Sequence, residues 1–226
     1  MHIAVLGTGM VGQTIAARLD ALGHDVTIGT RSPQATLART EPDTMGNAGF
    51  GAWAAEHPAI TVATFEQAAA AAELVVNATG GGVSLEALEA AGADNLAGKV
   101  MVDIANPLDF SQGMPPTLFV KDTDSLGEQI QRAFPATKVV KTLNTMNAYL
   151  MADPKQLADG DHSVFVSGDD AGAKETVTEL LTSMGHTDVI DLGDISTARG
   201  TEMILPVWLR LWGSLGTPAF NFKVVR

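Results

Sequence analysis

Three glycines near the start of the chain have the spacing that lets a protein backbone hold a pyrophosphate. Gly7, Gly9 and Gly12 form the pattern Gly-x-Gly-x-x-Gly, directly after the apolar segment 2–6. The first glycine allows a tight turn, the second lets a phosphate approach the backbone, and the third lets the next helix pack closely on the strand. The helix N-terminus adds N–H groups and a positive dipole end. The pattern predicts a dinucleotide site, the alternative being an ordinary strand–helix turn. The residues between these glycines are expected to share the site: Thr8, Met10 and Val11.

The segment Gly29-Thr30-Arg31-Ser32 ends the second predicted strand and bears on the choice of dinucleotide. In NAD-binding units an acidic residue at this place bonds the ribose hydroxyls, and none stands here. Two hydroxyls and a guanidinium can instead bond and neutralise a 2′-phosphate. The segment therefore favours NADP(H). The alternative is that Arg31 is a surface residue and Ser32 caps the next helix.

Polar or small residues follow three further apolar segments. Ligands of open parallel sheets bind at the carboxyl ends of the strands, so these residues are expected to line a cofactor cleft. They are Asn77, Ala78 and Thr79, then Ala105 and Asn106, and then Asn144 and Met146. By position, Asn144 and Met146 should face a nicotinamide, while turn capping is the alternative for Asn144 and Asn147.

No residue set forms a convincing acid–base or metal site. The five histidines show no metal-ligand spacing, and neither a nucleophile elbow nor a phosphate-binding Walker loop is present. Asp103, inside an apolar strand, is expected to accept backbone N–H bonds. Lys141 and Asn144 are three residues apart, which would place them on opposite faces of an extended strand. We therefore predict no catalytic side chain. Hydride transfer between two aligned planar cofactors needs alignment more than proton transfer.

The elements that must position these residues alternate as strands and helices along the whole chain. This predicts an α/β fold of the Rossmann type, a doubly wound and mostly parallel sheet with a C-terminal helical extension. We expect one compact unit over 1–226. Residues 1–145 would form the dinucleotide-binding core, and residues 146–226 would complete the sheet and close the substrate cleft.

Composition narrows the classes of partner. The 226 residues carry a formal net charge of −12, which argues against nucleic acid and anionic membranes. There are no cysteines, so disulfides and thiolate sites are excluded. No segment approaches the length of a membrane span and no signal peptide is recognisable, so a cytoplasmic protein that binds small-molecule cofactors is expected.

Two segments carry more apolar surface than a solvent-facing element needs. Residues 194–215 predict a long helix interrupted near Pro206, whose dense apolar face would close the pocket or pair with a second copy in a homodimer. Residues 41–58 predict a loop and a short helix, with Phe50 and Trp53 covering one face of the sheet. The loop 110–116 has no predicted role.

The chain resembles the F420-dependent NADP reductases of archaea and actinobacteria. The resemblance rests on segments 5–12 and 23–32, on Val76-Asn77-Ala78, and on segments 103–107, 141–146 and 198–202. It implies direct hydride transfer between nicotinamide C4 and the deazaflavin ring of coenzyme F420. It also implies phosphate contacts from Thr8, Thr30, Arg31 and Ser32, a cleft lined by Asn77, Ala78, Ala105 and Asn106, and a nicotinamide beside Asn144 and Met146.

Two other functions are compatible with the residues. One is an NADPH-dependent reductase of a small imine or carbonyl compound, with a proton donor in region 141–147 or 199–208. The other is a non-catalytic NADPH-binding module.

Overall fold

One eight-stranded sheet runs through the protein. The computed structural model describes residues 1–42 and 48–226, and the strand order is β10-β9-β8-β5-β4-β1-β2-β3. Every neighbouring pair is parallel except β8–β9, which is antiparallel. The strands are β1 (His2–Leu6), β2 (Asp25–Thr30), β3 (Thr61–Thr64), β4 (Leu74–Asn77), β5 (Val100–Asp103), β8 (Lys138–Thr142), β9 (Ser163–Ser167) and β10 (Asp188–Gly193). The predicted Rossmann-type, mostly parallel sheet is confirmed.

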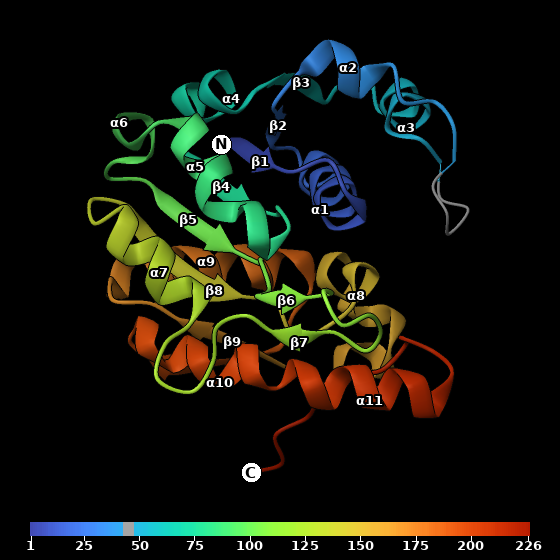
Figure 1. Ribbon diagram of the computed structural model, residues 1–226, viewed down its shortest axis with the longest axis vertical. Helices are drawn as coiled ribbons and strands as arrows, with labels where there is room; N and C mark the ends of the chain where they lie inside the picture. Colours follow the sequence, from blue (N-terminus) through green and yellow to red (C-terminus); the bar gives the residue numbers. More distant parts are fainter. Residues whose placement is uncertain (43–47) are drawn as a thin grey trace.

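Helices cover both faces of this sheet (Figure 1). They are α1 (Met10–Ala21), α2 (Pro33–Leu37), α3 (Phe50–Glu56), α4 (Phe65–Ala71), α5 (Ser84–Ala91), α6 (Ala93–Leu96), α7 (Leu126–Ala133), α8 (Ala148–Ala152), α9 (Ala171–Met184), α10 (Ala198–Met203) and α11 (Leu205–Leu215). Single 3₁₀ turns add η1 (Gly81–Val83), η2 (Pro154–Gln156), η3 (Ala158–Gly160) and η4 (Ile195–Thr197). Local sequence sets several helix starts, because Ser125 and Asp170 accept backbone N–H bonds at the first turns of α7 and α9.

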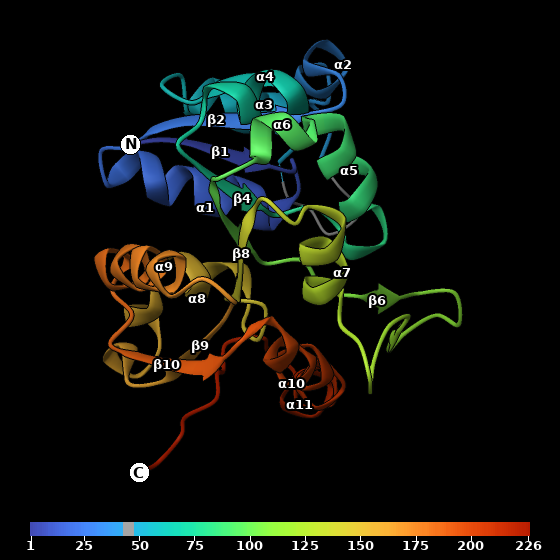
Figure 2. The ribbon, with the colours of Figure 1, turned by 90° about the vertical axis from the view of Figure 1, so that its left-hand side faces the viewer.

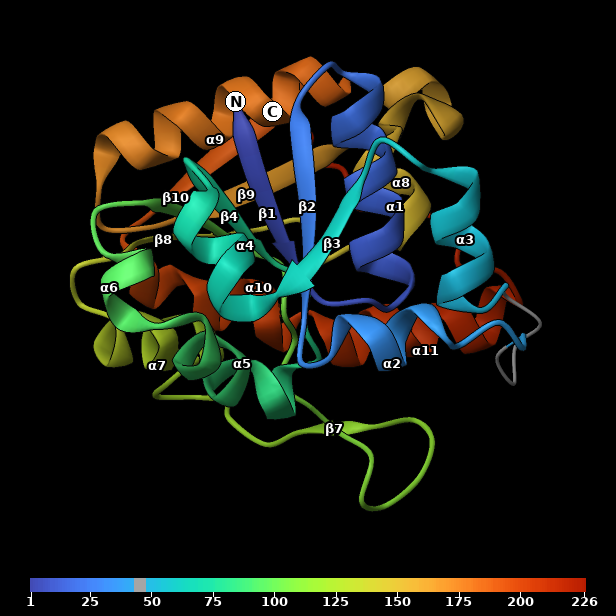
Figure 3. The ribbon, with the colours of Figure 1, turned by 90° about the horizontal axis from the view of Figure 1, so that it is seen from above.

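The alternation of side chains along each strand produces two separate apolar layers. Ile3 and Val5 of β1 pack with α1, α3, α8 and α9, whereas Ala4 and Leu6 pack with α4, α5, α6, α7 and α10. Figures 2 and 3 show α9 and α7 on opposite sides of the sheet. Both faces of the central strands are therefore dry, as a parallel sheet requires.

The C-terminal region carries a helical extension, and the predicted helix 194–215 is divided into η4, α10 and α11. The division falls at Ile204, and Pro206 stands in the first turn of α11, where its missing N–H breaks no helical bond. Phe50 is buried in the layer beside α1, as expected, and Trp53 packs against it. Part of the predicted loop, residues 43–47, lies outside the described residues.

The segment 110–116 forms the connection of a small antiparallel hairpin. Its two strands are β6 (Leu108–Asp109) and β7 (Thr117–Leu118). This hairpin projects from the body of the molecule in Figure 2. Among the residues that the structure describes, no helix has the length and apolar character needed to cross a membrane.

Candidate functional site

The glycine loop between β1 and α1 is shaped by contacts that leave no room for side chains. A Cβ on Gly7 would lie 2.5 Å from the carbonyl oxygen of Ala78, and Gly7 has a φ of 121°. A Cβ on Gly12 would lie 2.2 Å from the carbonyl oxygen of Gly7. A Cβ on Gly9, in contrast, would meet nothing within 4 Å. Gly7 and Gly12 therefore allow close packing, while the space at Gly9 is open to a ligand at the N-terminus of α1.

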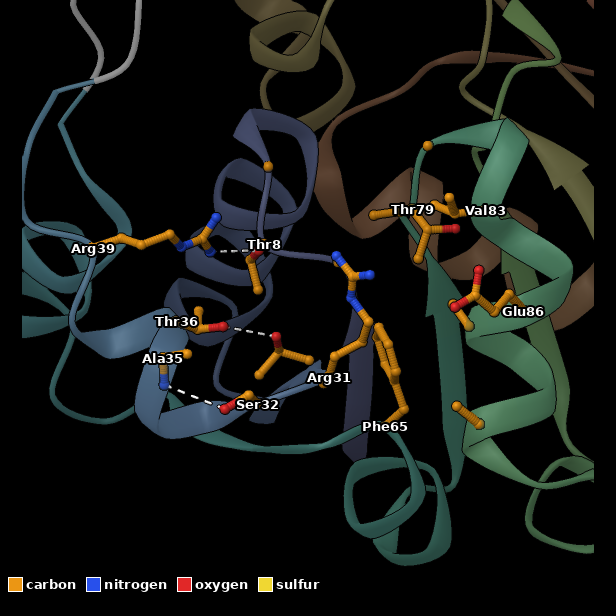
Figure 4. A pocket seen from close by; sticks show the side chains of 18 residues that line it. Thr8, Arg31, Ser32, Ala35, Thr36, Arg39, Phe65, Thr79, Val83 and Glu86 are labelled. Carbon is orange, nitrogen blue, oxygen red and sulfur yellow. Dashed lines mark hydrogen bonds between the residues drawn. The ribbon is translucent and has the colours of Figure 1, made fainter.

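A cavity of about 500 Å³ opens beside this loop (Figure 4). The predicted segment Thr30-Arg31-Ser32 lines it together with Thr8 and Gly9. The remaining lining comes from the glycine loop, β2, α2 and the chain after it, α4, the loop after β4, and α5. It consists of Gly7, Gly29, Ala35, Thr36, Arg39, Phe65, Ala78, Thr79, Gly80, Val83, Glu86, Ala87 and Ala90. The structure thus brings the glycine loop and the end of β2 to one cavity.

Hydroxyl groups form one wall of the cavity. Oγ1 of Thr30 and Oγ1 of Thr36 lie 2.8 Å apart and share a hydrogen bond. Oγ of Ser32 accepts a hydrogen bond of 3.4 Å from the backbone N–H of Ala35. Ser32 therefore caps α2, which was the alternative role predicted for it. The side chain of Ser32 also lines the cavity, so capping and ligand contact are compatible.

Arg39 is a cavity residue that the sequence reasoning did not identify. Its guanidinium donates a hydrogen bond of 2.8 Å to Oγ1 of Thr8 and lies 5.7 Å from the centre of the Phe50 ring. In the view of Figure 4, Thr8 lies between Arg39 and Arg31. The only signal in the sequence was a second arginine eight positions after Arg31 in an acidic chain. Two guanidiniums on one cavity provide the charge that a phosphate monoester requires.

A second cavity, of about 370 Å³, continues from the first along the carboxyl edge of the sheet. Ala78, Thr79, Gly80 and Val83 line both cavities. The second cavity is otherwise lined by Val11, Gly81, Gly82, Ile104, Ala105, Asn106, Leu108, Phe110 and Met151. Five of the predicted residues therefore meet here: Val11, Ala78, Thr79, Ala105 and Asn106. Among the residues that the structure describes, none that lines this cavity carries a titratable side chain.

Five of the predicted site residues line neither of these two cavities: Met10, Gly12, Asn77, Asn144 and Met146. The side chain of Asn77 is fully buried, and its Oδ1 accepts a bond of 2.7 Å from Oγ1 of Thr79. Asn144 is buried, and its Nδ2 donates to Oδ1 of Asn106 at 3.1 Å. Met146 is buried in the apolar layer beside α1. Asn77 and Asn144 thus contact residues that line the cavities, and a position of Asn144 and Met146 beside a nicotinamide stays a prediction.

Two further predicted roles can be compared with the structure. Oδ1 of Asn147 accepts a hydrogen bond of 3.0 Å from the backbone N–H of Leu150. Asn147 therefore caps α8, in agreement with the capping role predicted as its alternative. Met10 is partly exposed and lies on a third cavity, of about 560 Å³, that Thr8, Gly9 and Arg39 also line.

Behind the cavities lies a buried charged cluster. Asn77, Asp103 and Lys141 are direct neighbours across β4, β5 and β8. Nζ of Lys141 lies 2.9 Å from Asp103 and 2.9 Å from Glu202 of α10, and the side chains of all three are at most 1% exposed. Burial by itself lowers the pKa of Lys141, but the two carboxylates outweigh it and hold that pKa above its ordinary value.

The structure confirms one expectation about this cluster and corrects another. Oδ1 of Asp103 accepts the backbone N–H of Ala105 at 3.2 Å, as predicted. Lys141 and Asn144, however, do not diverge to opposite faces, because both reach α10: Lys141 contacts Glu202, and Asn144 donates to the carbonyl of Thr201. The reason is that β8 ends at Thr142 and Leu143 has a φ of 62°, so the segment is not extended.

Comparison with known proteins relates this geometry to a family. Residues 2–107 match the family model described as "NADP oxidoreductase coenzyme F420-dependent". A crystal structure of a candidate F420-dependent NADP reductase from Arthrobacter sp. FB24 is 68% identical, covers 99% of both chains and has a TM-score of 0.95.

Curated relatives are more distant. The F420-dependent NADP reductase of Methanothermobacter marburgensis is 29% identical over 93% of this chain and 92% of its own. The metalloreductase STEAP3 of Rattus norvegicus is 30% identical over 91% of this chain, and the chain spans only 37% of that protein. The chain also spans only 52% of the F420-dependent NADP reductase of Methanocaldococcus jannaschii.

The family match covers the glycine loop, the Thr30-Arg31-Ser32 segment and the ends of β4 and β5, and the 68% identity extends it over the rest of the chain. The chain therefore belongs to the F420-dependent NADP reductase family.

Proposed function

We propose that this protein transfers a hydride directly between NADP(H) and the deazaflavin coenzyme F420. The observation that carries the proposal is the pair of adjoining cavities along the glycine loop. One has a guanidinium-rich and hydroxyl-rich wall, and the other has no titratable side chain in its lining.

The first cavity supports the NADP(H) half of the reaction. The open space at Gly9 and the N-terminus of α1 suit the pyrophosphate. Arg31 and Arg39, with Thr8 and Ser32, suit a 2′-phosphate. No acidic residue stands at the end of β2, where a ribose 2′-hydroxyl would need one.

The second cavity supports the other half. Its lining is mostly glycine and apolar side chains, which can hold a flat ring against a nicotinamide. A reductase of an imine or carbonyl compound would need a proton donor within hydrogen-bond reach of its substrate, and the lining of this cavity supplies no acid. Hydride exchange between two rings needs only alignment, because the hydride carries both electrons and the proton that completes the reduced deazaflavin comes from water.

Absorbance measurements test this proposal. When NADPH and oxidised F420 are mixed with the protein, the two absorbances should show that both compounds are consumed in equal molar amounts, and NADP+ with reduced F420 should give the reverse reaction. NADPH oxidation by an imine or ketone, without response to F420, would instead identify a small-substrate reductase. Tight NADPH binding without oxidation by any acceptor would identify a binding module.

We propose further that the chain divides into a cofactor-binding core, residues 1–145, and a part, residues 146–226, that closes the second substrate's cleft. Met151 of α8 supports this division, because it belongs to the second part and lines the second cavity. Met151→Ala in the full-length protein should leave the Kd for NADP+ nearly unchanged and should lower F420 turnover. Unchanged turnover would refute the division.

A homodimer is our further proposal. Of the eleven residues of α11 only Leu205 is buried, while Val207 and Leu215 are more than half exposed and Trp208 packs against Trp212. Such an apolar face is larger than a solvated helix needs. Light scattering should give twice the chain mass, and a monomer mass would reject the dimer. We also propose a cytoplasmic location, where free NADP(H) is available, and cell fractionation tests it.

A further inference from the structure

The charged cluster behind the cavities lies where three strands end at the cofactor cleft. Asp103 and Lys141 face the same side of the sheet as α7 and α10, and Glu202 reaches them from α10. The cluster contains two carboxylates and one ammonium, so it holds a net negative charge in a dry environment. Such a charge is costly unless further donors compensate it.

The N-terminus of α7 supplies this compensation. The carboxylate of Glu202 accepts the backbone N–H of Leu126 at 2.8 Å and that of Gly127 at 3.0 Å. These are orphan donors of the first helical turn, where the helix dipole also favours a negative charge. A Cβ on Gly127 would lie 3.2 Å from Cβ of Ala198, so α7 and α10 approach each other closely at this point. The Lys141 ammonium therefore binds a carboxylate that is itself fixed to α7.

On the other side, the cluster holds the cavity lining in place. Asp103 accepts Nδ2 of Asn77 at 2.8 Å, and Asn77 accepts the hydroxyl of Thr79, which lines both cavities. Nζ of Lys141 also donates to the carbonyl of Ala105, which lines the second cavity. One ammonium thus joins two cavity-lining segments to α10.

We propose that Lys141 is a positioning residue of the NADP(H) site, whose ammonium sets the geometry of the Thr79 turn and of Ala105 where the cofactor crosses from one cavity to the other. It touches neither cavity itself. The proposal rests on the proposed function, because it concerns the same cofactor cleft.

Binding of NADP+ to the full-length protein tests this without any need for F420. In Lys141→Met the unbranched apolar stem is largely retained and the charge is lost. We expect the Kd for NADP+ to rise about tenfold, since small displacements of a supporting shell have effects of this size or larger. Lys99→Met is the matched control. Lys99 also donates to a carbonyl, that of Ala69 at 2.6 Å, but it precedes β5 at the opposite edge of the sheet. The Kd of Lys99→Met for NADP+ should equal that of the wild type.

Binding of adenosine 2′,5′-bisphosphate separates positioning from a general loss of stability, because this ligand contains only the half of NADP+ that the first cavity would hold. In Lys141→Met its Kd should change less than the Kd for NADP+, since Ala105 and the Thr79 turn lie on the second cavity. Equal losses for the two ligands, or a folded variant that binds NADP+ like the wild type, overturn the proposal.

A second variant covers the case in which Lys141→Met does not fold. Lys141→Met with Glu202→Gln has the same net charge as the wild-type cluster but lacks the bonds from the ammonium to Asp103 and Ala105. It should fold and still bind NADP+ at least about fivefold more weakly. Binding equal to that of the wild type overturns the proposal. Wild-type protein that fails to bind NADP+ would overturn the proposed function as well, whereas wild-type binding with unaffected variants overturns the role of Lys141 alone.

Discussion

The guanidinium of Arg39 donates a hydrogen bond to Oγ1 of Thr8, with 2.8 Å between the two atoms. This bond joins the chain after α2 to the glycine loop, and the Phe50 ring supports the guanidinium from 5.7 Å. Arg31 lines the same cavity from the end of β2. Both arginines therefore line one cavity, and we propose that they bind one phosphate group together.

Replacing Arg31 should change the choice of dinucleotide. Arg31→Ala is expected to weaken NADP+ binding by about 1.5–3 kcal/mol, the range for a charge-assisted contact, and to leave NAD+ binding nearly unchanged. Calorimetric titration with both nucleotides measures the difference. Arg210→Ala, an exposed arginine on α11, is the control. Equal losses for NADP+ and NAD+ would remove the 2′-phosphate role.

Replacing Arg39 tests the contact with Thr8 by a double-mutant cycle. Arg39→Met keeps the apolar stem over Phe50 and removes the guanidinium, and Thr8→Val removes the hydroxyl. Each variant should weaken NADP+ binding, and the coupling energy between them should be about 0.5–1.5 kcal/mol, the net value of one hydrogen bond. Strictly additive effects would show that the bond does not contribute to the site.

Substitution by alanine should have different effects at two glycines of the loop. Gly12→Ala places a Cβ 2.2 Å from the Gly7 carbonyl oxygen, so it should lower the free energy of unfolding by about 1–3 kcal/mol. Gly9→Ala meets nothing within 4 Å and should leave stability nearly unchanged, yet it should weaken NADP+ binding because the methyl group occupies the pyrophosphate space. Urea unfolding and NADP+ titration measure the two effects. Wild-type affinity in Gly9→Ala would place the pyrophosphate elsewhere.

His186 should make stability depend on pH. Burial lowers the pKa of His186 to about 4, against a bond from its ring to the carbonyl of Met151 that raises the pKa, and His162 nearby lowers it. In the unfolded chain this histidine takes up a proton near pH 6.5. Its contribution to the free energy of unfolding is therefore complete above that pH and decreases as the pH falls toward 4.

As the pH falls from 7.5 to 5.5, protonation of this histidine in the unfolded chain should lower the free energy of unfolding of the wild type by about 1–1.5 kcal/mol. His186→Gln keeps a donor for the carbonyl of Met151. Over the same pH interval, its free energy of unfolding, measured in urea, should fall less than that of the wild type by this amount. Parallel slopes for the two proteins would show that His186 does not titrate in this way.

The sequence was sufficient to predict the parts of the site that depend on residues close together in the chain. The glycine pattern, the absence of an acid after β2 and the small or polar residues after β4 and β5 all follow from local chain chemistry, and the structure brings them to one edge of the sheet. The contact between Lys141 and Glu202 could not be predicted, because 61 positions separate them and the contact depends on how α10 packs.

Backbone conformation limited the prediction in the same region. Leu143 has a φ of 62°, which residues other than glycine rarely adopt, so no sequence pattern indicated that β8 would end at Thr142 and that Asn144 would turn toward α10. Arg39 was missed because it follows α2 and reaches the glycine loop only through the tertiary fold.

Deuterium transfer tests the central claim most directly. NADPH labelled at C4, prepared separately as each of its two diastereomers, would be mixed with the protein and oxidised F420 in ordinary water, and the reduced deazaflavin would be analysed by mass spectrometry. We predict that one diastereomer delivers one deuterium per reduced F420 and the other delivers none. Reduced F420 without deuterium from either diastereomer, or oxidation of NADPH without reduction of F420, would contradict direct hydride transfer.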